Sequence, residues 1–223
     1  MRTKYPSTPH LPWSPGLQND DRRIPTLEHF VGREVVVTEK LDGENTSLYR
    51  DDLHARSLDT RPHPSRTWVK AERGRIAHQI PEGWRLCGEN VYAVHSLRYD
   101  DLDGYFYLFS VWDDLNISRP WDEVCEWAQR LGLPMPRELY RGIWDEVALQ
   151  ALTIDPERTE GYVVRVTAAI PYAEFGQKVA KWVRRGHVQT DAHWLSKPVE
   201  ANGLKALMDD VSASLMVDGG QAK

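Results

Sequence analysis

Four short groups of polar residues contain the side chains that could do chemistry. They are residues 40–45 (Lys-Leu-Asp-Gly-Glu-Asn), 88–90 (Gly-Glu-Asn), 160–162 (Glu-Gly-Tyr) and 178–181 (Lys-Val-Ala-Lys). A lysine attacks an electrophile only as the neutral amine, so its pKa, near ~10.4 in water, must fall before it reacts at neutral pH. Nearby cations or a bound metal lower that pKa. Glutamate oxygens are hard ligands that suit Mg²⁺.

Each group is weak evidence when it is taken alone. A Lys-x-Asp-Gly tetrad is common in solvated turns, Glu160 could be a plain strand start, and Lys178 with Lys181 could be an exposed edge that resists aggregation. In chain order, however, the groups give a lysine after an apolar strand, then two acids, then two lysines. This order favours one reactive site over four unrelated turns.

The polar groups lie at the ends of segments that predict strands. The β-branched run at residues 35–38 leads into Lys40, and Asp42-Gly43 predicts a hairpin turn before a second strand at residues 46–50. We expect further strands at residues 53–58, 84–93, 105–112, 161–166 and 178–183. Helical spacing of apolar residues predicts helices at residues 65–80, 121–131 (closed by Gly132), 143–152 and 204–216.

These elements predict a mixed α+β fold, a single domain built mainly on antiparallel strands with flanking helices. We expect an irregular N-terminal arm at residues 1–30, because five prolines lie among the polar residues of its first 26 positions. The domain itself should span residues 31–190. A C-terminal extension at residues 191–223 should be helical and pack on the same domain. The segment after Arg185 falls below the ~40 residues at which a domain stands alone, so we expect no separate OB-type domain there.

Composition limits the classes of function. A net charge of −5 gives no general attraction to phosphate, so nucleic-acid contacts must come from local Lys and Arg clusters. The only cysteines, Cys87 and Cys125, are too few for a zinc cluster and are typical of free thiols in a reducing compartment. No stretch approaches the ~18 apolar residues of a membrane span, and the N-terminus lacks a signal-peptide pattern. We expect a cytoplasmic protein with no membrane contact.

The four groups, in this order, resemble the motifs of the covalent nucleotidyltransferase superfamily of ATP-dependent DNA ligases, RNA ligases and mRNA capping enzymes. The resemblance covers about residues 35–185. Residues 40–43, preceded by Glu39, match the superfamily's first motif, Lys-x-Asp-Gly. Asn45 stands where the RNA-ligase branch often has asparagine and DNA ligases usually have arginine. The resemblance implies a nucleotidyltransferase domain, that is, an ATP-grasp-like ligase adenylation domain.

Three further positions resemble nucleotide-contacting residues of the superfamily. Arg56, in His-Ala-Arg-Ser, fits the arginine that reaches the donor phosphate or ribose, and Glu89 fits the glutamate near the ribose. Phe109 resembles the aromatic residue that stacks on the purine, although Ser110 replaces the more usual aspartate. A strand aromatic is more often a core residue, which is the alternative for Phe109.

The last two groups resemble the fourth and fifth motifs. Residues 160–164 match the fourth, and Lys178 with Lys181 resembles the fifth, where lysines grip the α-phosphate. That motif is commonly Lys-x-Lys. Lysines three apart on a strand would face opposite sides, so we favour Lys181 over Lys178.

The resemblance implies a role for each matched residue. Lys40 would be the nucleophile that carries AMP, with Lys181 and Lys178 as catalytic cations. Nucleotide contacts would come from Glu39, Asp42, Gly43, Asn45, Arg56, Glu89, Phe109 and Glu160. Glu160 and Glu89 would hold Mg²⁺ or Mn²⁺. A set of basic residues is as consistent with a solvated face as with a phosphate track: Arg61, Arg66, Lys70, Arg73, Arg75, Arg184 and Arg185.

The implied function is an ATP-dependent RNA ligase that transfers AMP through lysine to a 5′-phosphate and joins it to a 3′-hydroxyl. A DNA ligase, a capping-type nucleotidyltransferase and an inactive nucleic-acid-binding relative remain alternatives. A bare core with net charge −5 should bind RNA weakly and in a salt-sensitive way. The RNA could be a nicked duplex or a tRNA-like break, and a protein partner could supply nucleic-acid binding.

Overall fold

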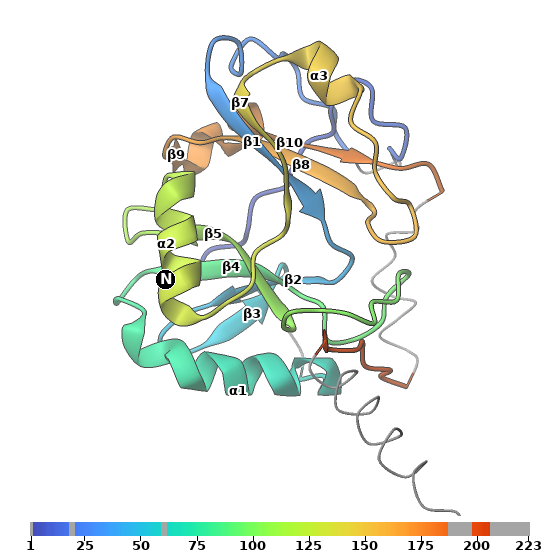
Figure 1. Ribbon diagram of the computed structural model, residues 1–223. Helices are drawn as coiled ribbons and strands as arrows, with labels where there is room; N and C mark the ends of the chain where they lie inside the picture. The colour runs from blue at the N-terminus through green and yellow to red at the C-terminus, as the bar shows by residue number, and fades with distance from the viewer. Residues whose placement is uncertain (1, 18–20, 59–61, 187–197, 206–223) are drawn as a thin grey trace, which may run out of the picture.

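The computed structural model describes residues 2–17, 21–58, 62–186 and 198–205, which form two antiparallel sheets with helices outside them (Figure 1). One sheet has the strand order β10-β8-β1-β7, and the other has the order β3-β2-β4-β5-β6-β9. The predicted α+β class with antiparallel sheets and flanking helices is therefore confirmed.

The strands are β1 (Glu34–Lys40), β2 (Glu44–Leu48), β3 (Leu53–Ala55), β4 (Arg85–Asn90), β5 (Phe106–Trp112), β6 (Ile117–Ser118), β7 (Glu138–Ile143), β8 (Gly161–Val166), β9 (Ile170–Pro171) and β10 (Val179–Val183). The α-helices are α1 (Thr67–Ile76), α2 (Trp121–Leu131), α3 (Glu146–Gln150) and α4 (Phe175–Lys178). Short 3₁₀ turns at Pro64–Arg66, Ala77–Gln79 and Tyr172–Glu174 adjoin α1 and α4.

The predicted hairpin at residues 35–50 is wrong, because β1 and β2 belong to different sheets. Asp42 does not close a turn between paired strands. Its carboxylate accepts hydrogen bonds from the backbone N–H groups of Ser96 at 2.8 Å and Leu97 at 2.7 Å. Gly43 passes so close to the end of β4 that a Cβ would lie 2.6 Å from the Asn90 carbonyl oxygen. This segment therefore carries the chain from one sheet to the other.

The structure also corrects several predicted boundaries. Residues 143–152 contain only the short α3, and the preceding edge strand β7 was not predicted because its residues do not alternate between buried and exposed. Lys178 ends α4 rather than starting a strand, so the argument about opposite strand faces does not apply to it. Strand β3 ends at Ala55, and the predicted helix at 65–80 is divided into α1 and two 3₁₀ turns. Most of the helix predicted at 204–216 lies outside the described residues.

Two helices cover one face of the six-stranded sheet. Val69 and Ile76 of α1 pack in the same buried cluster as Leu86 of β4, Leu108 of β5 and Trp121 of α2. Helix α2 ends as predicted, because Gly132 adopts a left-handed conformation with φ 64°. Figure 1 shows α1 at one end of the molecule and α3 at the other, beside the four-stranded sheet.

The N-terminal residues lie along strand β10, the edge of the four-stranded sheet. Leu11 N donates to the Lys181 carbonyl at 2.8 Å, and Lys181 N donates to the Pro9 carbonyl at 2.8 Å. Gly16 N donates to the Val183 carbonyl at 2.9 Å. The backbone of residues 9–16 therefore satisfies hydrogen-bonding groups that an edge strand would otherwise expose.

Residues 198–205 lie against the segment that links β4 to β5. The Asn202 side chain accepts a hydrogen bond from Tyr99 N at 2.9 Å and donates to the Val91 carbonyl at 2.7 Å. Tyr105 donates its hydroxyl to the Asn202 carbonyl at 2.8 Å.

Among the helices of the described segments, none is long and apolar enough to cross a membrane.

Candidate active site

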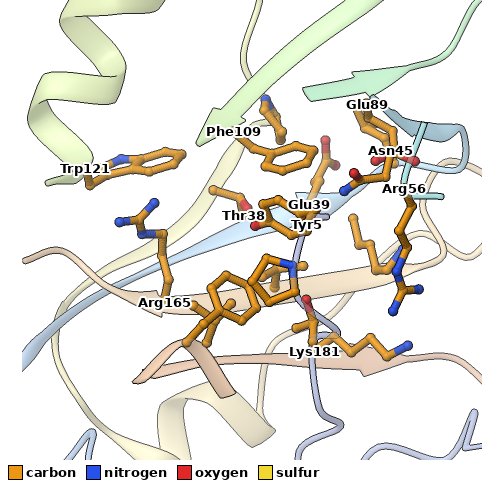
Figure 2. A pocket seen from close by; sticks show the side chains of 18 residues that line it. Tyr5, Thr38, Glu39, Asn45, Arg56, Glu89, Phe109, Trp121, Arg165 and Lys181 are labelled. Carbon is orange, nitrogen blue, oxygen red and sulfur yellow. The ribbon is translucent and has the colours of Figure 1, made fainter. Parts of the chain in front are cut away.

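A pocket of about 170 Å³ opens between strands of both sheets (Figure 2). Its walls come from β1, β2, β4, β5, β8, β10, α2 and the N-terminal segment. Figure 2 shows Phe109 and Tyr5 in the middle, Arg56, Asn45, Glu89 and Lys181 on one side, and Trp121 with Arg165 on the other. The predicted site residues that line it are Glu39, Lys40, Asn45, Arg56, Glu89, Phe109 and Lys181.

Lys40 ends β1 directly opposite Gly161, the first residue of the antiparallel strand β8. This register brings Glu160 to Lys40: Glu160 N donates to the Lys40 carbonyl at 3.2 Å, and the Glu160 carboxylate contacts the Lys40 ammonium. Thr159 also donates its hydroxyl to the Lys40 carbonyl at 2.8 Å. Position 161 requires glycine, because a Cβ there would lie 1.9 Å from the Trp182 carbonyl oxygen.

The surroundings of Lys40 favour its neutral form. Burial lowers the pKa of the Lys40 amine, and the positive charges of Lys181 and Arg56 lower it further, while the carboxylates of Glu89 and Asp42 oppose the shift. Contact with the Glu160 carboxylate also favours the charged form. The site therefore combines a partly buried amine with both cations and acids around it, which is the arrangement expected for an activated lysine.

Asp42 and Gly43 adjoin the pocket without lining it. Besides the two backbone hydrogen bonds to its carboxylate, Asp42 donates its own N–H to the Tyr99 hydroxyl at 2.9 Å. These contacts fix the backbone two residues after Lys40. Tyr99 was not predicted as a site residue. It lies far from the first motif in sequence, so no local sequence pattern indicates this contact.

Glu89 and Asn45 face each other as directly paired residues of β4 and β2. Burial raises the pKa of Glu89 to about 7, while the charge of Lys40 opposes the shift. The Asn45 Oδ1 atom is buried and has no hydrogen-bond partner among the residues that the structure describes. Glu39 lies at the pocket wall and accepts a hydrogen bond from Arg137 Nη2 at 2.6 Å.

Tyr5, in the aromatic part of the pocket, is one lining residue that the sequence analysis did not predict. The Tyr5 ring packs edge-on against Phe109, with ring centres 5.4 Å apart, and against Phe175 at 5.3 Å. Burial raises the pKa of the Tyr5 hydroxyl. Phe109 is thus both a pocket residue and a member of the surrounding apolar cluster.

Arg165 is a second lining residue that the sequence analysis missed. It is buried, and its guanidinium donates to the Arg119 carbonyl at 3.0 Å and the Val166 carbonyl at 3.2 Å. Burial lowers its pKa to about 10. An arginine between valines in a buried strand was the only signal in the sequence that could have identified it.

The two lysines of the fourth group are in different places. Lys181 lines the pocket, and its Nζ lies 3.1 Å from Asp21 Oδ1. Burial lowers the pKa of Lys181, and Asp21 opposes the shift. Lys178 instead forms an ion pair with Glu174, the last residue of the 3₁₀ turn before α4, and does not line the pocket.

Part of the predicted basic set is engaged in contacts within the protein. Arg66 is buried and pairs with Glu44, with its Nε 2.6 Å from Glu44 Oε2, so it does not belong to an exposed phosphate track. Arg73 donates to the Arg50 carbonyl at 2.7 Å. The remaining members are exposed or partly exposed, apart from Arg61, which lies outside the described residues: Lys70, Arg75, Arg184 and Arg185.

The described residues contain no group of three or more His, Cys, Asp or Glu side chains that could hold a metal ion. Two carboxylates, Glu89 and Glu160, lie beside Lys40. A Mg²⁺ or Mn²⁺ ion commonly keeps several waters and takes one or two protein carboxylates. The oxygen donors present therefore fit an ion of this kind that also binds a phosphate.

The sequence model of one protein family, described as RNA ligase, matches residues 33–183. No protein with a curated description matches the sequence.

Solved structures of two RNA ligases have a similar fold. A Naegleria gruberi RNA ligase with PPi gives a TM-score of 0.55 at 20% identity, covering 81% of this chain and 57% of that chain. An archaeal ATP-dependent RNA ligase also gives 0.55, at 18% identity, covering 81% of this chain and 48% of that chain. The chain thus spans about half the length of these structures.

Proposed function

The chain belongs to the RNA ligase family, and we propose that it is an ATP-dependent RNA ligase in which Lys40 carries AMP as a covalent intermediate. The observation that supports this most directly is that Lys40 contacts the buried Glu160 and lines a pocket together with Arg56 and Lys181. We further propose that residues 31–190 act as the adenylation domain, with the preceding arm packed against it; most of the following extension lies outside the described residues.

In the first step, the neutral Lys40 amine attacks the α-phosphorus of ATP. A nitrogen–phosphorus bond forms, the bond to the bridging oxygen breaks, and pyrophosphate leaves with the electron pair. Glu160, in contact with the amine, is placed to accept the proton that Lys40 must lose. Lys181 and Arg56 offset the negative charge that grows on the phosphate oxygens.

In the later steps, the AMP moves to RNA. A 5′-phosphate oxygen attacks the phosphorus of lysyl-AMP and releases the Lys40 amine. A 3′-hydroxyl then attacks the activated 5′-phosphate, and AMP leaves. The strands to be joined could be DNA strands, a nicked duplex or a tRNA-like break. Each should be assayed as a separate substrate for sealing.

We propose that Glu89 and Glu160 hold a divalent ion with ATP, since these acids flank the nucleophile. When bound, such an ion supplies charge that offsets the phosphate oxygens. A Naegleria gruberi RNA ligase mutant whose fold resembles this chain was solved with AMP and Mn, at a TM-score of 0.52 and 19% identity, covering 72% of this chain and 52% of that chain. The base would stack on Phe109, and Asn45 Oδ1 and Arg165 offer polar contacts to the nucleotide.

The test is incubation of the purified protein with α-labelled ATP and Mg²⁺, followed by denaturing electrophoresis. We expect label on the protein that is lost in acid, as for a phosphoramidate, and none on Lys40→Ala. Lys205→Ala removes an exposed lysine whose partner is Asp103 and serves as the matched control. Label from GTP rather than ATP would favour a capping-type enzyme, and no label from either nucleotide would contradict the proposal.

A further inference from the structure

The residue that faces Lys181 most closely comes from the N-terminal part of the chain. Asp21 Oδ1 lies 3.1 Å from Lys181 Nζ, and both side chains are largely buried, with 19% and 9% of their surfaces exposed. Residues 9–16 run along β10, and Ile24 N donates to the His10 carbonyl at 2.8 Å. The chain therefore folds back on itself after residue 16 and returns Asp21 to the pocket end of β10.

Asp21 is itself held by a second buried residue. His10 Nε2 lies 3.0 Å from Asp21 Oδ2, and His10 is completely buried. His10 Nδ1 lies 2.8 Å from Ser14 Oγ, which in turn accepts a hydrogen bond from Val183 N at 2.9 Å. A carboxylate at Nε2 favours the proton on that nitrogen, so Nδ1 accepts from the Ser14 hydroxyl.

These contacts form a continuous polar chain from the backbone of β10, through Ser14, His10 and Asp21, to the ammonium of Lys181. Each carboxylate oxygen of Asp21 has a different neighbour, so the carboxylate has a defined orientation. This is the arrangement by which a carboxylate and a histidine fix the position of a functional group.

We propose that Asp21, oriented by His10, is a positioning residue that holds the Lys181 ammonium in place for the phosphate of the nucleotide. The inference rests on the proposed function, because it takes Lys181 as the phosphate contact. It assigns a role in the site to the N-terminal arm, outside the residues that match the family.

The charges around Lys181 explain why it needs such a partner. Its cationic neighbours are Lys40 on β1 and Arg56 after β3, and His10 is kept neutral because burial and the charge of Lys181 lower its pKa to about 4. Asp21 is the nearby acid that favours the charged form of Lys181. Without it, the ammonium would face two cations in a buried position, and both its location and its charge would be less defined.

The arm does not depend on this ion pair for its attachment. Backbone hydrogen bonds join residues 9–16 to β10, and Leu11 is completely buried in the core. Asp21→Asn preserves the shape of the side chain and should leave this attachment in place. Its effect should therefore fall on Lys181 rather than on the fold.

The experiment measures single-turnover formation of lysyl-AMP over a range of ATP concentrations, with Mg²⁺ present. We expect Asp21→Asn to lower the maximal rate at least about tenfold, the size of one charge-assisted hydrogen bond. Asp21→Glu should restore part of the rate. The alkaline limit of the rate should move to lower pH in Asp21→Asn, because Lys181 loses the acid that favours its charge. Asp52→Asn, which removes a carboxylate that pairs with Arg2 of the same arm, is the matched control.

A double mutant separates positioning from a structural role. In a Lys181→Ala background, Asp21→Asn should have no further effect, since its target is gone. An equal loss in both backgrounds would overturn the inference, and so would a faster rate in Asp21→Asn, which would mean that Asp21 restrains Lys181. If the wild type forms lysyl-AMP and Asp21→Asn forms it at the same rate, the inference about Asp21 is wrong but the proposed function stands. Absence of label on the wild type would overturn the proposed function and this inference with it.

Discussion

Glu160 and Lys40 meet twice across the β1–β8 pair: the Glu160 N–H donates to the Lys40 carbonyl at 3.2 Å, and the Glu160 carboxylate contacts the Lys40 ammonium. The backbone contact fixes where the carboxylate lies, because it is part of the antiparallel register that pairs Lys40 with Gly161. Lys40 and Glu160 therefore keep their relative positions as long as the two strands remain paired. The geometry of the proposed nucleophile, Lys40, is set by the register of two paired strands.

The first prediction separates the lysine-dependent step from sealing. Lys40→Ala should form no lysyl-AMP but should still join an RNA strand that already carries AMP on its 5′-phosphate, because only the first two steps pass through the lysine. The measurement is sealing of a pre-adenylylated nicked RNA by wild type and mutant. If the mutant folds normally but does not join the pre-adenylylated RNA, Lys40 also acts after AMP transfer.

The second prediction concerns Glu160 and the metal. Glu160→Gln should slow adenylylation by orders of magnitude, because it removes both a metal ligand and the acid in contact with Lys40. Chelation with EDTA should abolish adenylylation by the wild type, and added Mg²⁺ or Mn²⁺ should restore it. Glu157→Gln alters an exposed acid three positions earlier and should have no effect. If Glu160→Gln is adenylylated at the wild-type rate at low Mg²⁺, Glu160 is neither a metal ligand nor needed beside Lys40.

The third prediction tests stacking by Phe109. Phe109→Ala should raise the KM for ATP more than it lowers the rate of chemistry, since a base stacked on an aromatic ring gains about 1–3 kcal/mol. Phe109→Leu keeps an apolar side chain and removes the ring, so it should fold like the wild type and still show the raised KM. If Phe109→Leu binds ATP normally while Phe109→Ala unfolds, the residue is a core residue and not a stacking platform.

Seven of the 18 residues that line the pocket were predicted from local motifs, and the other eleven were not. Lys40 and Glu89 stand at strand ends in recognisable motifs, so their types and order could be recognised. Tyr5 reaches the pocket, and Asp21 reaches Lys181, because the N-terminal segment packs along β10. No periodicity or motif in a proline-rich segment encodes which strand it will meet.

The same reason accounts for the errors in the fold. Strands with β-branched or aromatic runs, such as β1 and β5, were predicted because such residues suit a pleated sheet. Their partners were not predictable: β1 pairs with β7 and β8 instead of the adjacent β2. Strand pairing between segments far apart in sequence depends on the packing of the whole domain, which single-segment patterns do not report.

The fourth prediction addresses RNA contact through α1. Lys70 is exposed, whereas Arg66 is buried against Glu44, so Lys70 is the better candidate for a phosphate contact. Lys70→Ala should weaken RNA binding and reduce the slope of log affinity against log salt by about 1, as for one lost phosphate contact. Arg66→Ala should instead reduce stability. Filter binding of nicked RNA across a salt series checks this, and an unchanged slope for Lys70→Ala would place the RNA elsewhere.

The last prediction concerns the attachment of the N-terminal arm at acid pH. His10 is completely buried, and burial followed by the charge of Lys181 lowers its pKa from 6.5 to about 4. Between these values the unfolded chain binds a proton at His10 and the folded chain does not. The free energy of unfolding therefore falls as pH falls through this window, and the contribution is fully present only above pH 6.5. At about 1.4 kcal/mol per pKa unit, the loss is at most about 3.5 kcal/mol.

We expect urea unfolding followed from pH 7 to pH 4 to show this loss in the wild type. His10→Gln keeps a donor near Asp21 but does not titrate, so its stability should vary less across the same window. His78→Gln changes an exposed histidine and should follow the wild type. The protection of the Leu11 amide, which is bonded to the Lys181 carbonyl, relative to its intrinsic exchange rate at each pH should fall on acidification in the wild type and in the His78 variant. It should fall less in His10→Gln. Equal pH dependence in the His10 and His78 variants would show that the arm is held independently of the charge state of His10.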